Sequence, residues 1–431
     1  MNDDIRRALC ENYCEPVRDM LWGHIYLTPA LAAITQSAPF MRLHRIMQLG
    51  PTFMVYPGAT HTRASHSIGV YHLARRLLCH LAGQGADSWL SAEGVKSFLC
   101  AALLHDAGHF PYTHSLKELP LKDHESLTAS LIVSEPLKSL ISAAGGDPYM
   151  AAAIVDTQAE SGGGSGGSAD GEVLFYRRLL SGALDPDKLD YLSRDGRYCG
   201  VPYGAQDVDF IFSRLQPDRE RGVVIDSRGI PAVESLLFAK YLMYRAVCWH
   251  KAVRSATAMI KKALFAALES RAIAPEELYN LDDQGLFARA AARACPLFSL
   301  AESVKNGRFF TLAAEIPFNE HAHGDALRLS ARPRMEESLA QALSPCLGTA
   351  LRADELIIDV GEPVSFESGL FVTDENCLFS EGSSVFKGSF PDAFATSLRT
   401  IRIFVEPGFE RDIEKSREGI LHTAEKWLTL L

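Results

Sequence analysis

Residues 95–114 read VKSFLCAALLHDAGHFPYTH and join an apolar stretch to a group of histidines. The part from Val95 to Leu104 is apolar enough to predict a mostly buried helix. It runs directly into His105 and Asp106, a polar pair whose burial is unfavourable without partners. A shared cation would supply those partners, so this stretch predicts a metal site at the end of a buried helix.

More histidines follow this pair. His109 and His114 come after Gly108, at which the helix can end, and His124-Glu125 lies on the next expected helix. Histidine titrates near neutral pH, so these side chains are candidates for moving protons near a reacting group. The competing interpretation is a solvated, histidine-rich loop.

The predicted metal site draws its remaining ligands from two other motifs. His66 in RASHS and Asp187 in DPDKLDY complete a set of two imidazoles and two carboxylates with His105 and Asp106. Such a set suits a borderline or hard divalent ion, with Mn, Fe, Mg, Co, Ni and Zn as the candidates. Spacing alone does not separate a ligand from a hydrogen-bonded core histidine, and residues 185–195 could form a charged helix face instead.

Length and composition limit the class of protein. A chain of 431 residues with 47% hydrophobic residues can bury sizeable cores and has the size of a globular enzyme. The net charge of -10 argues against nucleic acid as a partner, although a local basic pocket could still hold phosphates. The nine cysteines lack CxxC spacing, and neither a signal peptide nor a membrane-length apolar run is present. We therefore expect a cytoplasmic protein without membrane contact.

Hydrophobic patterning predicts a mainly α fold with a smaller mixed α/β C-terminal region. Helices are expected after Thr28-Pro29 and over 40–50, 67–81, 173–180, 233–266, 286–294 and 413–430. Strands are expected for LIIDV, SGLFVTD and TIRIFVEP, which are rich in β-branched and aromatic residues. This pattern predicts a helical domain at 1–270 and the mixed region at 271–431. Within the first, the SGGGSGGS stretch at 161–168 should be a flexible loop, because glycine and serine bury little area.

Short motifs follow one another along about the first 260 residues. They are Gly23-His24-Ile25, Gln48-Leu49-Gly50, Pro57-Gly58-Ala59, Arg63 to His66, His105 to His114, His124-Glu125, Asp187 to Asp195 and His250-Lys251. In this order they resemble the HD-domain phosphohydrolases, and within them the deoxynucleoside triphosphate triphosphohydrolase branch, which includes the vertebrate antiviral HD proteins with a sterile-alpha-motif domain. The resemblance implies an HD helical core, a divalent metal ion, a homo-oligomer, and hydrolysis of deoxynucleoside triphosphates to deoxynucleoside and triphosphate.

The resemblance also implies roles for single residues. Those implied to bind the metal are His66, His105, Asp106 and Asp187, and those implied to act at the α-phosphate are His109, His114, His124 and Asp106. Those implied to bind substrate are Gln48 and Leu49 in the sugar pocket, Tyr191 and Asp195 at the sugar 3′-hydroxyl, and Arg63, Lys188 and Lys240 on the phosphates. A guanidinium fork suits phosphate oxygens well.

Several positions depart from the family pattern. Cys248 stands where the family has the tyrosine that closes the 2′ side of the sugar, so deoxy selectivity stays open. Lys117 replaces an acidic residue three positions after His114, with Glu118 beside it. Activation by guanine nucleotides is not expected, because the corresponding positions read Gln36, Met41 and His44.

Other functions remain open on the sequence alone. A phosphatase of nucleoside monophosphates or modified nucleotides would use the same metal site, and a nucleotide-binding sensor would use the pocket without turnover. The cations Arg63, Lys188 and Lys240 favour a triphosphate, because three positive charges exceed what one phosphate requires. The missing GYP signature disfavours a cyclic dinucleotide hydrolase, and the acidic balance disfavours a single-strand nuclease.

Overall fold

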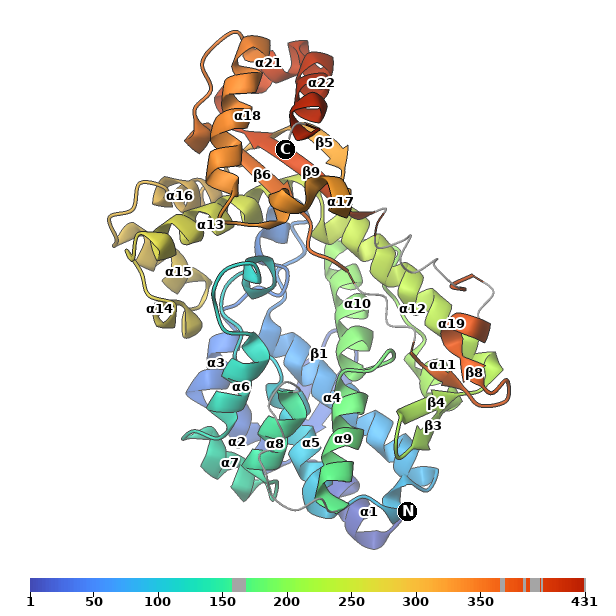
Figure 1. The fold of residues 1–431 in the computed structure, drawn as a ribbon. Coiled ribbons are helices and arrows are strands. Elements are labelled where there is room, and N and C mark those ends of the chain that lie inside the picture. Colours follow the sequence, from blue (N-terminus) through green and yellow to red (C-terminus); the bar gives the residue numbers. More distant parts are fainter. Residues whose placement is uncertain (157–167, 365–368, 383–384, 388–395, 397, 430–431) are drawn as a thin grey trace.

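A helical body surrounds three central helices, α4 (Arg63–Gly83), α5 (Ala92–Leu104) and α10 (Pro186–Cys199) (Figure 1). The computed structural model describes residues 1–156, 168–364, 369–382, 385–387, 396 and 398–429. Helices dominate these residues and the sheets are small, which confirms the predicted fold class. Most of the predicted Gly/Ser loop, residues 161–167, lies outside the described residues.

The other helices up to the C-terminal sheet are short to medium in length. They are α1 (Asp3–Cys10), α2 (Pro29–Thr35), α3 (Ala38–Leu43), α6 (His124–Ile132), α7 (Leu137–Ala143), α8 (Pro148–Val155), α9 (Ser168–Leu180), α11 (Val208–Arg214), α12 (Ile230–Met243), α13 (Lys251–Glu269), α14 (Glu276–Tyr279), α15 (Asp283–Ala291) and α16 (Phe298–Lys305). The 3-10 turns between them include η1 (Gly50–Met54) and η3 (Thr113–Leu116), and a π-helical turn, η5 (Tyr244–Cys248), follows α12. No described helix is both long and apolar enough to cross a membrane.

Local sequence sets the ends of the central helices. The Ser91 side chain caps α5 by accepting a hydrogen bond from a backbone N–H of its first turn. The Asp185 side chain caps α10 in the same way, at 2.7 Å from the Lys188 nitrogen. α5 ends at Leu104, as predicted, so the helix boundary places His105 at the edge of the buried core.

Two predicted helices end earlier than their patterning suggests. The helix predicted over 40–50 ends at Leu43, because the segment behind it pairs with another strand-like piece: the Gln48 N–H donates to the His61 carbonyl at 3.0 Å. The run over 233–266 is divided by η5, after which His250 caps α13. Tertiary pairing and a local change of helix type therefore override the helical pattern at these places.

Three small sheets accompany the helices. β1 (Glu15–Asp19) and β2 (Gly23–Leu27) form an antiparallel hairpin, and β5 (Thr311–Pro317), β9 (Thr400–Val405) and β6 (Leu356–Val360) form the C-terminal sheet in that order. A third sheet has the order β3 (Leu215–Asp218), β4 (Gly222–Ile225), β7 (Phe371–Val372), β8 (Cys377–Leu378). The C-terminal helices are α17 (Glu320–His323), α18 (Arg332–Leu347), α19 (Phe379–Gly382), α21 (Glu410–Lys415) and α22 (Arg417–Leu428).

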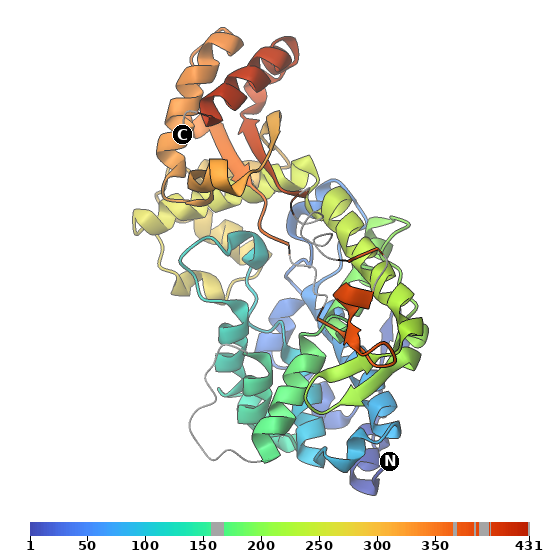
Figure 2. The same ribbon diagram turned by 45° about the vertical axis from the view of Figure 1, so that its right-hand side comes forward.

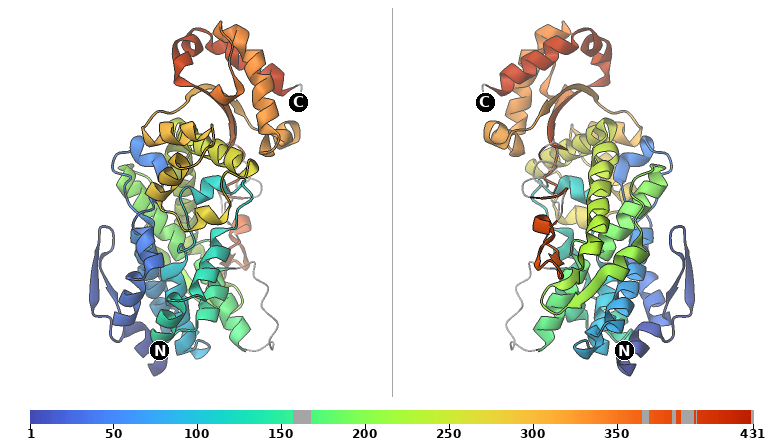
Figure 3. Two further views of the ribbon diagram at one scale, coloured as in Figure 1. Left: turned by 90° about the vertical axis from the view of Figure 1, so that its left-hand side faces the viewer. Right: turned by 90° about the vertical axis from the view of Figure 1, so that its right-hand side faces the viewer.

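The C-terminal sheet is covered on both faces. Along β6, Leu356, Ile358 and Val360 pack into one apolar cluster with α18 and α22, whereas Ile357 packs with Phe404 against α13. This alternation follows the two-residue period of a strand. Both views of Figure 3 show this α/β unit at one end of the molecule and the N-terminus at the other.

One C-terminal segment returns to the helical body. β7 pairs in parallel with β4, with Val372 opposite Ile225, and Phe379 and Phe386 belong to the apolar cluster of the helical body. Figure 2 shows this orange-red segment beside α12, away from the rest of the C-terminal unit. The predicted boundary near residue 270 stays a prediction, because the two parts of the chain share this packing.

Candidate metal and catalytic site

His66 anchors the candidate site from the first turns of α4. Its Nδ1 lies 2.9 Å from Asp190 Oδ2 on α10, and its Nε2 lies 2.9 Å from Asp187 Oδ1 on the same helix. Burial opposes a charged imidazolium, but the hydrogen bonds and charges of Asp187 and Asp190 outweigh it and raise the pKa of His66 to about 10. The side chain is therefore held firmly between two carboxylates.

His105 approaches the same place from the end of α5. Its Nδ1 lies 2.9 Å from the Ala102 carbonyl oxygen, and its Nε2 is 3.8 Å from Asp187 Oδ1. Each of His66, His105 and Asp187 offers a ligand atom, and these atoms lie within 4.8 Å of one another. The structure therefore brings together three of the four residues predicted to bind metal.

The chemistry of this group fits a divalent ion. The Ala102 carbonyl and the Asp190 carboxylate accept hydrogen bonds from the Nδ1 atoms. Once a cation has displaced the second proton of His66, each imidazole would therefore keep its proton on Nδ1 and present a lone pair at Nε2. The Nε2 atom of His105 is buried and has no hydrogen-bond partner among the described residues. A cation between these nitrogens and Asp187 would satisfy it, and such a His/Asp group is typical of HD metal sites.

Asp106, the fourth predicted ligand, lies at the edge of this group. Its Oδ1 is 3.4 Å from His105 Nε2 and 3.0 Å from His109 Nε2, and its Oδ2 accepts a 2.7 Å hydrogen bond from Arg63. Burial opposes its charge, yet His109, His105 and Arg63 hold the pKa of Asp106 well below its usual range. Asp106 therefore stays ionised and connects the predicted metal ligands with Arg63, which is predicted to bind phosphate.

A second histidine cluster adjoins Asp106. The rings of His109 and His124 stack with centroids 3.8 Å apart, and the His114 ring lies 4.7 Å from His109. His109 is fully buried, and its Nδ1 has no hydrogen-bond partner among the described residues. Burial and the nearby Arg63 charge lower the pKa of His109 well below its ordinary value. The structure thus brings the three predicted catalytic histidines together.

A close approach of two backbones holds the turn between the clusters. A Cβ atom on Gly108 would lie 2.4 Å from the His124 carbonyl oxygen and 2.5 Å from the Thr128 nitrogen at the start of α6. From the other side, Arg42 donates to the carbonyl oxygens of Ala107 and His109 at 2.6 and 2.5 Å. Glycine is therefore required at 108 so that the turn can lie against α6.

The predicted substrate residues lie at different distances from the two histidine clusters. Arg63 is the first residue of α4, and Gln48 pairs with the His61 backbone next to it, with Leu49 half-buried alongside. Lys188 binds Asp185 at 2.7 Å and the Gly182 carbonyl oxygen at 2.9 Å. Lys240 is buried on α12, outside both clusters.

Tyr191 and Asp195, which are predicted to hold the sugar 3′-hydroxyl, both lie on α10, and Cys248 ends η5. Burial and then the Asp195 carboxylate raise the pKa of the Cys248 thiol. Burial and then Tyr244 raise the pKa of Tyr191, to which Asp187 and Asp195 also contribute. The Cys248 thiol is therefore close enough to Asp195, one of the predicted sugar contacts, for that carboxylate to affect its pKa.

The sequence analysis missed several supporting residues. Asp190 is fully buried, and beyond His66 it binds both the Arg194 guanidinium and, at 2.6 Å, the indole N–H of Trp22. Arg194 in turn donates to Asp19 at 2.8 Å. The signal for Asp190 was present, because it lies three positions after Asp187 and hence on the same helix face.

A buried pair supports Asp195 in a similar way. His61 Nε2 lies 2.8 Å from Asp195 Oδ1, and neither side chain is exposed by more than 6%. No local pattern joins positions 61 and 195, so this pair could be found only from the fold.

A mainly helical fold here brings together one group of two histidines and an aspartate and a second group of three histidines, each of which could hold a metal ion. Residues 63–194 match the HD domain family, and residues 207–385 match the HD associated region. The chain therefore carries an HD domain followed by an HD associated region.

Individual relatives cover part of the chain. An uncharacterized protein of Bacillus subtilis (strain 168), YwfO, is 36% identical over 230 residues, which are 53% of this chain and 50% of YwfO. Human deoxynucleoside triphosphate triphosphohydrolase SAMHD1 is 27% identical over 276 residues, 58% of this chain and 44% of SAMHD1. The chain spans about half the length of the curated relatives it matches.

A solved structure shares the fold over nearly the whole chain. The crystal structure of a hypothetical protein from Aquifex aeolicus has a TM-score of 0.69 and covers 94% of this chain and 98% of its own. At 24% sequence identity this likeness establishes the fold alone.

Proposed function

We propose that this protein hydrolyses deoxynucleoside triphosphates to deoxynucleoside and inorganic triphosphate with a divalent metal ion. The observation that carries the proposal is the convergence of His66 Nε2, the buried His105 Nε2 and Asp187, next to Arg63 and His109. The name of the human relative, SAMHD1, states this activity and supports the choice of substrate. Mn, Fe, Mg, Co, Ni and Zn all suit the donor set.

In this proposal the metal ligands are His66, His105, Asp106 and Asp187. A divalent ion held by these residues would polarise a phosphoryl oxygen and would lower the pKa of a bound water. Asp106 also fixes Arg63, whose buried Nε has no hydrogen-bond partner among the described residues and is left to donate to a phosphate oxygen. A guanidinium that is already held in place loses little freedom when it binds phosphate.

The second cluster supplies protons in the same proposal. When the bond between the α-phosphorus and the sugar 5′-oxygen breaks, that oxygen requires a proton. His109, His114 and His124 are the candidate donors, and Glu125 Oε2 lies 2.9 Å from His124 Nδ1. Burial lowers the pKa of His109 and His114 in the free protein, and the negative charges of a bound triphosphate would favour their protonated forms. Burial alone would raise the pKa of Glu125, but His124 lowers it to about 2, so this carboxylate stays ionised and can orient the ring.

Lys188 favours a second candidate. Its ammonium group is already bound by Asp185, whose pKa is raised to about 7 because burial outweighs the Lys188 charge. A triphosphate would have to share this cation with Asp185 or displace that carboxylate, whereas a smaller phosphate ester would not require Lys188. A phosphatase of nucleoside monophosphates or modified nucleotides is therefore the alternative.

Product analysis tests the proposal. We would incubate the purified protein with each of the four dNTPs and four NTPs plus Mn or Mg and separate the products by ion exchange. Asp187→Ala, prepared in parallel, would expose contaminating phosphatases. We expect triphosphate and deoxynucleoside from the dNTPs. Cleavage of none of the eight triphosphates, with metal-dependent cleavage of nucleoside monophosphates in parallel incubations, would support the alternative, and saturable nucleotide binding without turnover would indicate a sensor.

Ribonucleotides report on the sugar pocket. Equal cleavage of NTPs would mean that Cys248 leaves the 2′ side open. The proposal also includes a homo-oligomer in the cytoplasm and a domain boundary near residue 270, as the family resemblance and the sequence texture indicate. Mass photometry of the purified chain would test the oligomer.

A further inference from the structure

The segment that carries His114 is fastened to the C-terminal part of the molecule. Leu116 at the end of η3 (Thr113–Leu116) and Leu119 after it are buried in an apolar cluster formed mainly by α13 and its neighbours. Further on, the Lys122 N–H donates to the Tyr279 hydroxyl at 3.1 Å. The histidine segment therefore has its packing partners in the HD associated region.

Glu118 lies in the middle of this segment and binds two cations from different helices. Lys261 of α13 donates to its Oε2 at 2.7 Å, and Arg332 of α18 reaches Oε1 at 2.8 Å and Oε2 at 3.1 Å. The exposed side-chain fractions are 20% for Glu118, 3% for Lys261 and 5% for Arg332. The bidentate Arg332 contact fixes direction as well as distance.

Lys261 also belongs to a chain of ion pairs that leads to the C-terminal sheet. Lys261 also binds Glu362 at 3.2 Å, Glu362 binds Arg254 at 2.5 Å, and Arg254 forms a bidentate pair with Asp359 of β6 at 2.7 and 2.8 Å. The network thus runs from the C-terminal sheet through α13 to Glu118. Such a connected network holds its members more rigidly than an isolated surface pair would.

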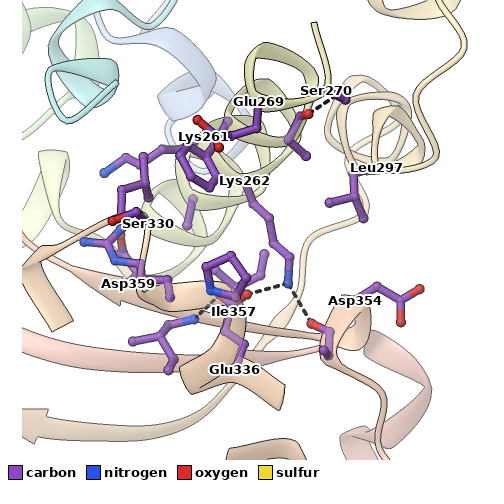
Figure 4. Close-up of a pocket in the computed structure, with 18 residues that line it drawn as sticks. Lys261, Lys262, Glu269, Ser270, Leu297, Ser330, Glu336, Asp354, Ile357 and Asp359 are labelled. Atoms are coloured by element: carbon purple, nitrogen blue, oxygen red, sulfur yellow. Dashed lines mark hydrogen bonds and ion pairs between the residues drawn. The ribbon is translucent and has the colours of Figure 1, made fainter. Parts of the chain in front are cut away.

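The same helices carry a comparable ion pair that does not reach the histidine segment. Lys262 of α13 binds Glu336 of α18 at 2.8 Å, on the wall of a cavity of about 650 Å³ between α13, α18 and β6 (Figure 4). Glu118 links α13 to α18 through Lys261 and Arg332, and the Lys262–Glu336 pair links the same two helices. Of the two links, the one through Glu118 includes a residue close to His114. Glu336 is therefore a matched control for Glu118.

We propose that Glu118 is a positioning residue for His114 and its two neighbouring histidines. It lies four positions after His114, and its contacts hold the segment at the distance at which the His114 ring lies 4.7 Å from His109 and 5.2 Å from His124. The C-terminal region thereby sets the geometry of the second cluster through one carboxylate. This inference rests on the proposed function of these histidines.

The test compares Glu118→Gln with Glu336→Gln. The first keeps the shape of the side chain but removes the charge that holds both cations, and the second weakens the same helix pair elsewhere. We expect Glu118→Gln to lower kcat by roughly 10- to 100-fold, because misplacement by about 1 Å has such an effect, with KM and bound metal unchanged. Glu336→Gln should lower Tm and leave kcat within twofold.

Two further measurements separate positioning from folding. Hydrogen exchange of peptides covering 110–122 should quicken in Glu118→Gln and not in Glu336→Gln, and this readout does not depend on turnover. The conservative variant Glu118→Asp, which keeps a negative charge between Lys261 and Arg332, should retain more kcat than Glu118→Gln. Equal kcat in wild type and Glu118→Gln, or equal losses in both Gln variants, would overturn the inference. If the wild type did not hydrolyse dNTPs but exchange over 110–122 were still faster in Glu118→Gln than in the wild type, the anchoring by Glu118 would be upheld and the proposed function rejected.

Discussion

The two histidine clusters lie side by side but are built differently. In the first, His66 and His105 each have Nδ1 fixed by an acceptor, so both Nε2 atoms are aimed at one point near Asp187. In the second, His109 lies 3.0 Å from Asp106 without hydrogen-bond geometry, and its ring stacks on His124. One cluster is held by oriented hydrogen bonds and the other mainly by ring packing.

This difference indicates two tasks. A metal ligand must keep one nitrogen unprotonated and pointed at the ion, which an acceptor behind the other nitrogen achieves. A proton donor must gain and lose its proton, so a fixed partner on each nitrogen would oppose its task. Substitutions in the first cluster should therefore remove the metal, and substitutions in the second should slow turnover while the metal stays bound.

The largest effect is expected from Asp187→Ala. This side chain is 37% exposed, so its loss should remove the metal with little cost to the fold. Turnover should fall to the level of the wild type treated with chelator, and metal analysis should find the ion missing. An active variant with bound metal would exclude Asp187 from the first cluster.

Asp106→Ala is a less clean test of the same cluster. It would leave the buried Arg63 guanidinium without its carboxylate, which costs about 3–5 kcal/mol of unfolding free energy for a buried pair. Loss of metal and loss of stability would then occur together.

The next largest effect is expected from His109→Gln. General acid–base catalysis contributes roughly 10²- to 10⁴-fold, so kcat should fall by that order while the metal stays bound. Metal analysis alongside steady-state kinetics checks the prediction. If the variant lost one of two bound ions, the second cluster would be a metal site as well.

Asp190→Asn should weaken metal binding through His66. Loss of a partner behind a metal-binding histidine lowers affinity by roughly 10- to 100-fold. The matched control is Asp19→Asn, which also removes a carboxylate from Arg194 but does not touch His66. Metal titration should distinguish the two variants, whereas both should lower Tm. Equal metal affinities would mean that Asp190 serves folding alone.

The smallest effect is expected from Gly108→Ala. The added Cβ would press on the backbone at His124, so α6 must shift away from the turn. Overpacking of this kind costs about 1–3 kcal/mol, and kcat should fall several-fold with the metal retained. Thermal denaturation and kinetics together check it, and an unchanged kcat would show that the second cluster tolerates movement of α6.

Local patterning predicted the elements that carry the first cluster. The apolar run before His105 gave α5 and its end, and the β-branched runs gave β6 and β9. These features depend on residues close together in the chain, whose periods are visible in the sequence. The mainly α fold and the gathering of the histidines could therefore be predicted.

The supporting contacts could not be predicted, because they join distant positions. Asp19 meets Arg194 and His61 meets Asp195 only after α4 and α10 have packed. The placement of Asp106 between Arg63 and His109, rather than within the group of His66, His105 and Asp187, likewise follows from the packed geometry. No local pattern carries such information.

The parallel pairing of β7 with β4 has a consequence for synthesis on the ribosome. Val372 is 147 positions after its partner Ile225, so at about 5–20 residues per second the edge of β4 waits roughly 7 to 30 s for it. During that time the apolar surface later covered by Phe379 is open to water and to other chains. A nascent chain at this stage should be a substrate for chaperones, although most of its helices are already complete.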